Sequence, residues 1–384
     1  MSSNSLKIVH VIPSLQKGGA ERLVLNISEQ LVLLGHTVHI IVFREGNEYL
    51  DLSSGINIEV IPSQVLYSLT GKDITETEAF DARIREIQPD IIHSHLLESE
   101  FVSRFNPLEG TTYVTHWHGC HPPTNSKKFK DYFSKDSWWS INSINQLKRQ
   151  YKHCNNHFLC ISNFIELYVK RAFNPNDENV TVILNGTDLS KFKFESVERD
   201  KEVFTMVTVG SFNTYKNQIF LLKVIKALKE LGLVNFKLQL LGDGIERKNL
   251  ESYSKNNSLG NMVEFFGYVD NPGHYMNRAH ALVHSAIDEP FGLILLEAMS
   301  CKTPVVAFQS GGIPEIVLNG KTGLLTGVND VSAFVQALTQ LNSNSSLIKE
   351  LGEAGQKAVQ EFAIDKYVKR IENLYFDLLK TKQD

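Results

Sequence analysis

Two stretches of the sequence follow the same order of features, and that order limits the fold more than any other property of the chain. Residues 6–43 run through an apolar segment, a glycine loop, an amphipathic helical pattern and a second apolar segment. Residues 204–244 follow the same order with different residues, so they open a second domain without being a sequence repeat. Near-continuous apolar strands that alternate with helices predict parallel sheets covered by helices on both faces. We therefore expect an α/β protein with two doubly wound domains.

Chain length and the segment between the two stretches predict where the domains end. A chain of 384 residues, 42% of them hydrophobic, exceeds one ordinary core and suits two domains of about 150–200 residues each. Residues 187–202 are polar and poor in strand patterns, which indicates a first domain at 1–190 and a second at 200–364. Residues 365–384 form a helical pattern with an apolar stripe, which could pack on the second domain or cross back onto the first.

Composition argues against several classes of protein. The formal net charge is -4 and the two signs are interspersed, so nothing indicates a nucleic-acid partner. The four cysteines form no C-x-x-C pair, which is typical of reduced thiols in the cytosol. No apolar run approaches the roughly 20 residues of a membrane span, and the N-terminus lacks the apolar region of a signal peptide. We expect a cytoplasmic protein.

Residues 288–301, DEPFGLILLEAMSC, place one glutamate on a loop and a second inside a helical pattern. Glu289 follows a strand pattern, and parallel sheets bind ligands where their strands end. Residues 291–301 have a helical pattern, and Pro290 stands where a missing N–H costs little, at the start of that helix. The start of this helix would attract phosphate through its unpaired amides and its dipole. We expect a nucleotide diphosphate there, with Glu297 on the ribose hydroxyls and Glu289 beyond the diphosphate. The alternative for Glu297 is a solvated surface position, which its apolar neighbours disfavour. The expected amide donors are those of Phe291, Gly292 and Leu293.

This segment resembles the E-x7-E signature of the retaining glycosyltransferases of the GT-B fold, glycosyltransferase family four. Further motifs match the family in its own order and span about residues 7–330. They are GGAER (18–22), HWHG (116–119), NGTD (185–188), VGSFNTYKN (209–217), LLGDG (240–244), FFGYV (265–269) and GGIPEIV (311–317). Glycine loops are common, so no single motif is decisive, but the ordered set is specific.

The resemblance implies two Rossmann-like domains that face each other across a cleft. It implies a hexosyltransferase that moves a sugar from a nucleotide-diphospho-sugar, with UDP as the expected nucleotide, to a glycan or lipid-linked acceptor hydroxyl with retained anomeric configuration. The donor is a substrate, so no cofactor is expected. No catalytic metal is expected either, because lysine and helix amides would stabilise the leaving diphosphate. Members with a GGAER loop build surface polysaccharide, lipopolysaccharide or lipid-linked glycans.

In the first domain, the residues that match functional positions of the family lie on a glycine loop and at one histidine. The resemblance implies that the loop at Gly18 and Gly19 reaches across the cleft to the donor phosphates and the acceptor. We expect these glycines to use the positive φ that glycine permits. His118 corresponds to the active-site histidine that contacts the donor sugar.

Family positions in the second domain fall on two loops. The resemblance implies that Gly210, Ser211 and Lys216 bind the departing diphosphate. The family usually has an arginine where this chain has Ser211, so Lys216 would carry more of the electrostatic role. Backbone groups near Gly267 and Val269 would bind the edge of the nucleobase. The candidate catalytic residues are His118, Glu289 and Lys216.

Two other functions stay open on the sequence. A catalytically silent nucleotide-sugar-binding protein would keep the pocket without the arginine. A metallohydrolase would use the H-x-H pattern of His116 and His118 together with His121, and the second H-x-H pattern of His93 and His95. The strand ends that follow offer no convincing set of acidic ligands for such a site.

Residues 126–152 mix basic and aromatic side chains on a helical pattern. Such a segment can lie on an anionic membrane surface, although a solvated helix with a buried aromatic side has the same pattern. Membrane contact would place the protein at the inner face of the cytoplasmic membrane, where a lipid-linked acceptor is available.

Overall fold

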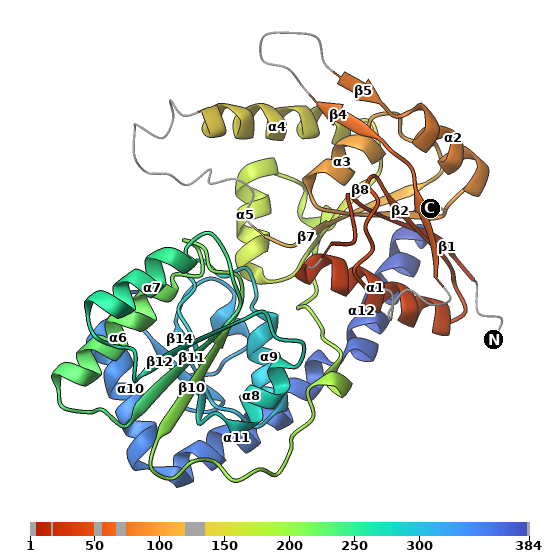
Figure 1. Ribbon diagram of the computed structural model, residues 1–384. Coiled ribbons are helices and arrows are strands. Elements are labelled where there is room, and N and C mark those ends of the chain that lie inside the picture. The colour runs from red at the N-terminus through yellow and green to blue at the C-terminus, as the bar shows by residue number, and fades with distance from the viewer. Residues whose placement is uncertain (1–4, 17, 50–55, 67–73, 120–134, 382–384) are drawn as a thin grey trace. The chain divides into compact units, whose positions relative to one another are not determined.

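The computed structural model describes residues 5–16, 18–49, 56–66, 74–119 and 135–381, and the chain divides into two compact units (Figure 1). Unit 1 comprises Met1–Asn185 and Ile364–Asp384, and unit 2 comprises Gly186–Ala363. The division falls after Asn185, at the beginning of the polar segment, and the C-terminal helix belongs to unit 1. The chain therefore passes from one unit to the other twice.

Unit 1 contains a seven-stranded parallel sheet. Its first strand, β1 (Lys7–Ile12), pairs with β2 on one side and with β6 on the other. The apolar run around β1 is almost completely buried, as expected for a strand covered on both faces. A separate antiparallel pair consists of β4 (Gln64–Leu66) and β5 (Ile74–Glu76). The sheet order is β3 (Asn57–Val60), β2 (Thr37–Val42), β1 (Lys7–Ile12), β6 (Ile91–His95), β7 (Thr112–Trp117), β8 (Asn156–Cys160) and β9 (Val180–Val182).

One core of unit 1 joins the first and the last helix of the chain. Leu23 and Ile27 of α1 (Gly19–Leu33) pack with Ile8 of β1 and with Ile371 of α12 (Ile364–Lys380) in one buried cluster. Figure 1 shows the blue helix α12 beside the red helix α1. The helical stripe at the C-terminus thus buries its apolar side against the sheet of unit 1. The helices are α1 (Gly19–Leu33), α2 (Glu78–Ile87), α3 (Leu97–Ser103), α4 (Lys135–Tyr151), α5 (Asn163–Phe173), the short 3-10 turn η2 (Asp177–Asn179) and α12 (Ile364–Lys380).

Unit 2 contains a six-stranded parallel sheet with the order of a dinucleotide-binding domain. Its core runs from β10 and α6 (Gln218–Glu230) to α10 (Val331–Ser343). Phe220, Phe308 and Phe334 are in mutual edge-to-face contact there. The α/β class with two doubly wound sheets, expected from the sequence, is confirmed. The sheet order is β12 (Val263–Gly267), β11 (Phe236–Leu241), β10 (Phe204–Val209), β13 (Ala281–His284), β14 (Val305–Phe308) and β15 (Gly323–Thr326).

Helices follow most strands of unit 2, while a 3-10 turn connects β14 to β15. They are α6 (Gln218–Glu230), α7 (Arg247–Asn256), α8 (Pro272–Arg278), α9 (Leu293–Ser300), α10 (Val331–Ser343) and α11 (Ser345–Val359), with 3-10 turns η3 (Leu189–Lys191), η4 (Ile313–Glu315) and η5 (Gln360–Phe362). None of the helices in the described ranges combines the length and the apolar character that a bilayer span requires.

Candidate functional site

The loops that follow β10 and β13 meet at the topological switch point of unit 2. The two strands are neighbours in the sheet, but the chain continues from β10 to one side and from β13 to the other. Doubly wound sheets bind ligands at such a point, outside the carboxyl ends of the strands. The loops at 210–217 and 285–292 are therefore the structural candidates for a ligand site.

The side chains of Asn213 and Ser285 fix the loop after β10. Gly210 begins it with a φ of 143°. Asn213 Oδ1 accepts the Lys216 amide at 2.9 Å, and Asn213 Nδ2 donates to the Ser211 hydroxyl at 3.0 Å. The Ser285 hydroxyl donates to the Lys216 carbonyl at 3.0 Å, which ties this loop to the one after β13. The backbone of Lys216 is thus held independently of its side chain.

Lys216 and Glu289 form an ion pair between the two loops. Lys216 Nζ donates to Glu289 Oε2 at 2.6 Å, and His284 Nε2 lies 2.9 Å from the same oxygen. The Glu289 side chain is 8% exposed. Burial alone would raise the pKa of this carboxyl, but the Lys216 charge and the bond with His284 outweigh it and lower the pKa to about 2. Glu289 is therefore an anion that holds a cation at the switch point.

The helix after Glu289 begins later than the sequence pattern indicated. α9 starts at Leu293, so Pro290 lies three residues before the helix and not in its first turn. The N-cap residue is Gly292, whose φ of 102° is left-handed and favours glycine. This turn is the physical reason for the late start. The amides of residues 291–293 donate no hydrogen bond to any described residue, so the start of α9 keeps unused donors.

Glu297 lies inside α9 and is buried. It is the fifth residue of the helix, about 6 Å along the axis from Leu293. Its exposure is 9%, and its neighbours Leu296 and Ala298 are fully buried. A solvated surface position, the alternative from the sequence, does not describe this carboxylate.

The GGIPEIV segment supports the backbone at Glu289. The Gly312 amide donates to the Glu289 carbonyl at 2.8 Å. Gly311 has a φ of 59°, and a Cβ there would lie 2.2 Å from the same carbonyl oxygen. Only glycine fits so close to another backbone segment. The two glycines of this motif therefore shape the site because they lack a side chain.

The residues expected at a nucleobase lie at the end of β12. Gly267 ends this strand with a φ of 73°, and its carbonyl accepts the Gly242 amide at 2.7 Å. Val269 follows at a half-buried position. β12 and β10 are separated by β11, so Gly267 and Lys216 lie at the same edge of the sheet two strands apart.

In unit 1, the glycine loop adopts a different conformation from the one expected. Gly18 has a φ of -164°, extended backbone that any residue adopts, and Gly19 is the first residue of α1. The expectation that these glycines use a positive φ is therefore wrong. A Cβ at Gly18 would instead lie 2.1 Å from the carboxylate of Glu21. The Tyr49 hydroxyl contacts both the amide and the carbonyl of Gly18 at 2.8 Å and holds the loop.

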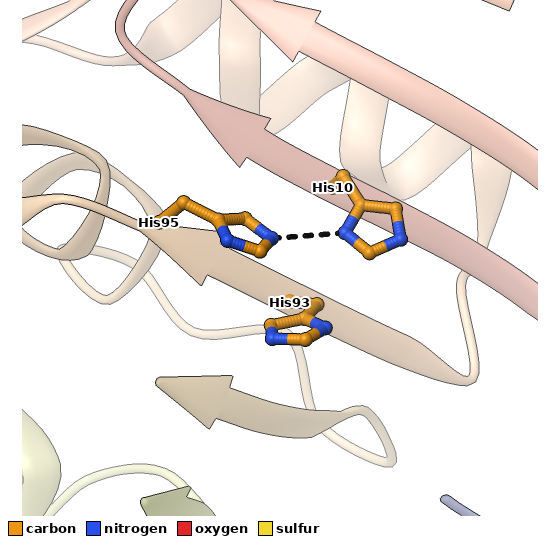
Figure 2. Close-up of side chains that lie close together, drawn as sticks. All are labelled: His10, His93 and His95. Carbon is orange, nitrogen blue, oxygen red and sulfur yellow. Dashed lines mark hydrogen bonds between the residues drawn. The ribbon is translucent and has the colours of Figure 1, made fainter. Parts of the chain in front are cut away.

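Histidines gather on three neighbouring strands of unit 1. His118, which follows β7, has Nε2 2.9 Å from Nδ1 of His95 on β6. His95 Nε2 lies 3.0 Å from Nδ1 of His10 on β1, the contact drawn in Figure 2. His93 and His116 complete two overlapping groups whose nitrogen atoms lie within 4.8 Å of one another. His118 therefore stands at the edge of a buried cluster.

Two residues of these contacts, His284 and His10, were not expected from the sequence. His284 ends β13 just before Glu289, so its position at a strand end was an available signal. His10 lies inside an apolar strand, and only the pairing of β1 with β6 brings it to the cluster. His121 and residues 126–134 lie outside the described residues, so the metal set with His121 and the first part of the expected membrane segment stay predictions.

Two family models match consecutive parts of the chain. The model described as Glycosyltransferase Family 4 matches residues 17–191, and the model described as Glycosyl transferases group 1 matches residues 190–358. The first contains the glycine loop and the histidines of the cluster except His10, and the second contains Lys216, Glu289 and Glu297.

Two curated relatives match part or nearly all of the chain. N-acetyl-alpha-D-glucosaminyl L-malate synthase from Bacillus anthracis is 30% identical over 55% of this chain and 54% of its own length, so the chain spans about half of that relative. UDP-Gal:alpha-D-GlcNAc-diphosphoundecaprenol alpha-1,3-galactosyltransferase from Escherichia coli is 24% identical over 99% of both chains.

Anabaena Alr3699/HepE, solved in complex with UDP and glucose, has a TM-score of 0.77 at 19% identity over 96% of this chain and 99% of that one, which shows the shared fold. The two family models cover nearly the whole chain in the order of its two units, and the chain belongs to the glycosyl transferases of group 1, in glycosyltransferase family four.

Proposed function

We propose that this protein transfers a hexose from a UDP-sugar to a hydroxyl of a glycan or lipid-linked acceptor, with the anomeric configuration retained, in the synthesis of surface polysaccharide or glycolipid. The observation that carries the proposal is the pair of Lys216 and Glu289 beside the unused amides of residues 291–293 at the switch point of unit 2. The relative from Escherichia coli, whose name gives a UDP-Gal donor and a diphosphoundecaprenol acceptor, supports the choice of substrates.

In the proposed binding mode, Lys216 and Glu289 separate, and each binds a part of the donor instead. The donor diphosphate accepts from the amides of residues 291–293 and takes Lys216 as its counter-ion. Glu289, released from the lysine, accepts hydrogen bonds from the sugar hydroxyls, while His284 keeps it oriented. Glu297 accepts from the ribose hydroxyls, as acidic residues do in dinucleotide sites.

Catalysis in this proposal is electrostatic. Charge grows on the diphosphate as the bond to the sugar breaks, and Lys216 with the helix amides stabilises it at that moment. These groups replace a divalent metal, so we propose a metal-independent reaction without a cofactor. His118 of unit 1 acts on the sugar that is transferred. We assign no covalent nucleophile and propose attack on the face that the diphosphate leaves.

Release of nucleoside diphosphate from UDP-sugars in the presence of an acceptor tests the proposal. Lys216→Ala should lower turnover about 10²–10³-fold, because a preorganised charge at the leaving group is lost. Lys223→Ala, an exposed lysine on α6, is the matched control and should leave turnover unchanged. Equal turnover in wild type and Lys216→Ala would refute the assigned role of Lys216.

A thermal-shift panel of nucleotide-sugars tests binding separately from transfer. A donor at 100 times its dissociation constant should add about 2.7 kcal/mol of stability. Glu297→Ala should abolish this gain, Glu230→Ala on α6 should keep it, and His118→Ala should keep the gain but reduce transfer. Binding without any diphosphate release would instead favour the catalytically silent alternative. Turnover lost to a chelator and restored by zinc or manganese would favour the metallohydrolase.

A further inference from the structure

One face of the unit 1 sheet carries a continuous group of histidines. His10 pairs with His93 across β1 and β6, and His95 pairs with His116 across β6 and β7. Residues paired on neighbouring strands share a face, and so do residues two positions apart on one strand. These four imidazoles therefore project to the same side, where Figure 2 shows three of them. His118 extends the group beyond the end of β7.

Two hydrogen bonds connect the group into a line that leads from its edge to its interior. The line runs from Nε2 of His118 to Nδ1 of His95 at 2.9 Å, and from Nε2 of His95 to Nδ1 of His10 at 3.0 Å. His118 is partly exposed, while His95 and His10 are completely buried. His10 Nε2 has no hydrogen-bond partner among the described residues, so the line has a closed inner end.

We propose that His10 and His95 form a charge-neutral relay that holds His118 in a single tautomer, with the proton on Nδ1. His10 and His95 are positioning residues in this arrangement, because they act through His118. The consequence for transfer rests on the function proposed above, whereas the tautomer itself does not.

The direction of the relay follows from the closed inner end. A neutral imidazole has one N–H donor and one acceptor nitrogen, so all donors in the line point the same way. If they pointed inward, His10 would keep a buried N–H without an acceptor. If they point outward, His10 keeps only an unused lone pair on Nε2. Buried N–H groups without an acceptor are rarer in proteins than buried acceptors without a donor, so the outward direction is favoured. His95 Nδ1–H therefore donates to Nε2 of His118, whose own proton is on Nδ1.

Burial keeps the relay neutral. It lowers the pKa of His10 to about 3 and that of His95 well below the ordinary value, because the charged form would lose its hydration. On the same strands, His93 and His116 face the line and have lowered pKa values for the same reason.

The covering helix places two phenols against these histidines. α12 contributes Tyr375, whose hydroxyl lies 2.5 Å from Nδ1 of His93, and Tyr367, whose hydroxyl lies 3.2 Å from Nε2 of His116. Burial raises the pKa of both phenols. At neutral pH the relay therefore gives His118 a hydrogen-bond donor without a positive charge.

The ring orientations favour a relay over a metal site. A metal ion lies about 2 Å from each ligating nitrogen and in the plane of each ring. The rings of His93 and His95 are stacked instead, 4.4 Å apart and 27° from parallel, and those of His116 and His118 are 4.1 Å apart at 28°. The candidate groups in the described part of the chain contain only histidine, so a divalent charge would also lack a carboxylate partner.

Nitrogen-15 NMR of the full-length, histidine-labelled protein tests the relay directly. The wild-type spectrum should show His118 with a protonated Nδ1 and a bare Nε2 from pH 6 to 8, with the signals assigned by their loss in His118→Gln. A protonated Nε2, an exchanging mixture of tautomers, or one equivalent of bound divalent metal in the purified protein would overturn the proposal. This measurement needs no variant of the core to fold.

Variants at position 95 separate the relay from general packing. His95→Leu removes the donor, so His118 should become a mixture of tautomers. His95→Asn places an amide where Nδ1 stood and should restore the single tautomer. His39→Asn, on β2 and paired with Glu59 instead, should leave the His118 signals unchanged. The relay would be wrong if His118 kept a single tautomer in a His95→Leu variant that circular dichroism shows to be folded.

Kinetics separate the relay from the proposed function. His95→Leu should lower diphosphate release by about tenfold in the wild-type background and have no further effect in His118→Ala, because residues that act as a unit are not additive. Equal losses in both backgrounds would mean that His95 does not act through His118. A correct tautomer together with full activity of His118→Ala would support the relay and refute the catalytic role of His118.

Discussion

At the residue scale, the charge of Glu289 should appear in the pH dependence of stability. Its pKa is about 2 in the folded state against an ordinary value of 4.5, so the carboxylate stabilises the fold above pH 4.5 and loses this contribution as the pH falls toward 2. The full loss amounts to about 3 kcal/mol, from about 1.4 kcal/mol per pKa unit. Glu289→Gln, which cannot titrate, should lack this part of the acid destabilisation.

Hydrogen exchange of peptides from β13 and β14 measures this effect within unit 2. The difference in opening free energy between wild type and Glu289→Gln should stay constant from pH 7 to 5 and shrink below pH 4.5. A difference that stays constant down to pH 3 would contradict the lowered pKa.

Gly292 allows a second test at the residue scale. Its φ of 102° costs any other residue about 1–2 kcal/mol, and a Cβ would lie 2.9 Å from Leu295 Cδ1. Gly292→Ala should therefore destabilise unit 2 by about that amount and weaken UDP binding, because the amides at the start of α9 shift. The control is Gly260→Ala, where a Cβ meets open space. If calorimetry and UDP titration give wild-type values for Gly292→Ala, this turn does not position the amides.

At the element scale, local patterns predicted most strands and helices, and what they missed depends on one left-handed turn and on contacts between distant residues. The apolar period of α1 and the buried run of β1 are visible in neighbouring residues. The start of α9 was misplaced because Gly292 adopts a left-handed turn that apolar spacing does not reveal. The two H-x-H patterns marked His95 and His118 as candidate metal ligands, but their direct contact joins residues 23 positions apart, so sequence spacing did not predict it as a hydrogen bond. The pair of Lys216 and Glu289 was expected at one site only because both motifs match one family.

Helix α4 and the residues that follow it contain the described basic side chains of the segment expected at the membrane. Its described residues bury Ile144 and Leu147, and leave Arg149 and the following Lys152 exposed with Lys148 half-buried. Each basic residue near an anionic surface contributes about 1 kcal/mol. Replacing all three by alanine should weaken binding to phosphatidylserine vesicles at low salt by on the order of 100-fold.

Vesicle sedimentation measures this loss, and three exposed lysines of unit 2 provide a control with the same change of charge. The control combines Lys223→Ala, Lys248→Ala and Lys357→Ala. Equal vesicle binding by wild type and the α4 variant would remove α4 from the proposed membrane contact.

At the scale of the whole molecule, each unit has its own core, but only unit 1 depends on both ends of the chain. The cluster of unit 2 lies within residues 204–351, whereas the cluster of unit 1 joins Leu6 with Tyr375. All three tryptophans, Trp117, Trp138 and Trp139, belong to unit 1. Tryptophan fluorescence therefore reports on unit 1 alone, which allows the two units to be followed separately.

Removal of α12 should unfold unit 1 and spare unit 2. A chain that ends at Ala363 loses four fully buried apolar side chains, Tyr367, Val368, Ile371 and Tyr375, and uncovers the histidine face of the sheet. Burial of each such side chain stabilises by about 1.5–3 kcal/mol, so the sum is comparable with the whole stability of a domain. Tryptophan emission should shift to the red, while hydrogen exchange in β10, β13 and β14 stays slow and UDP still protects unit 2. A chain that ends at Thr381 is the control and should keep wild-type emission. If the chain without α12 kept native tryptophan emission, unit 1 would not need this helix, and the tyrosine cover over the histidines would have no structural role.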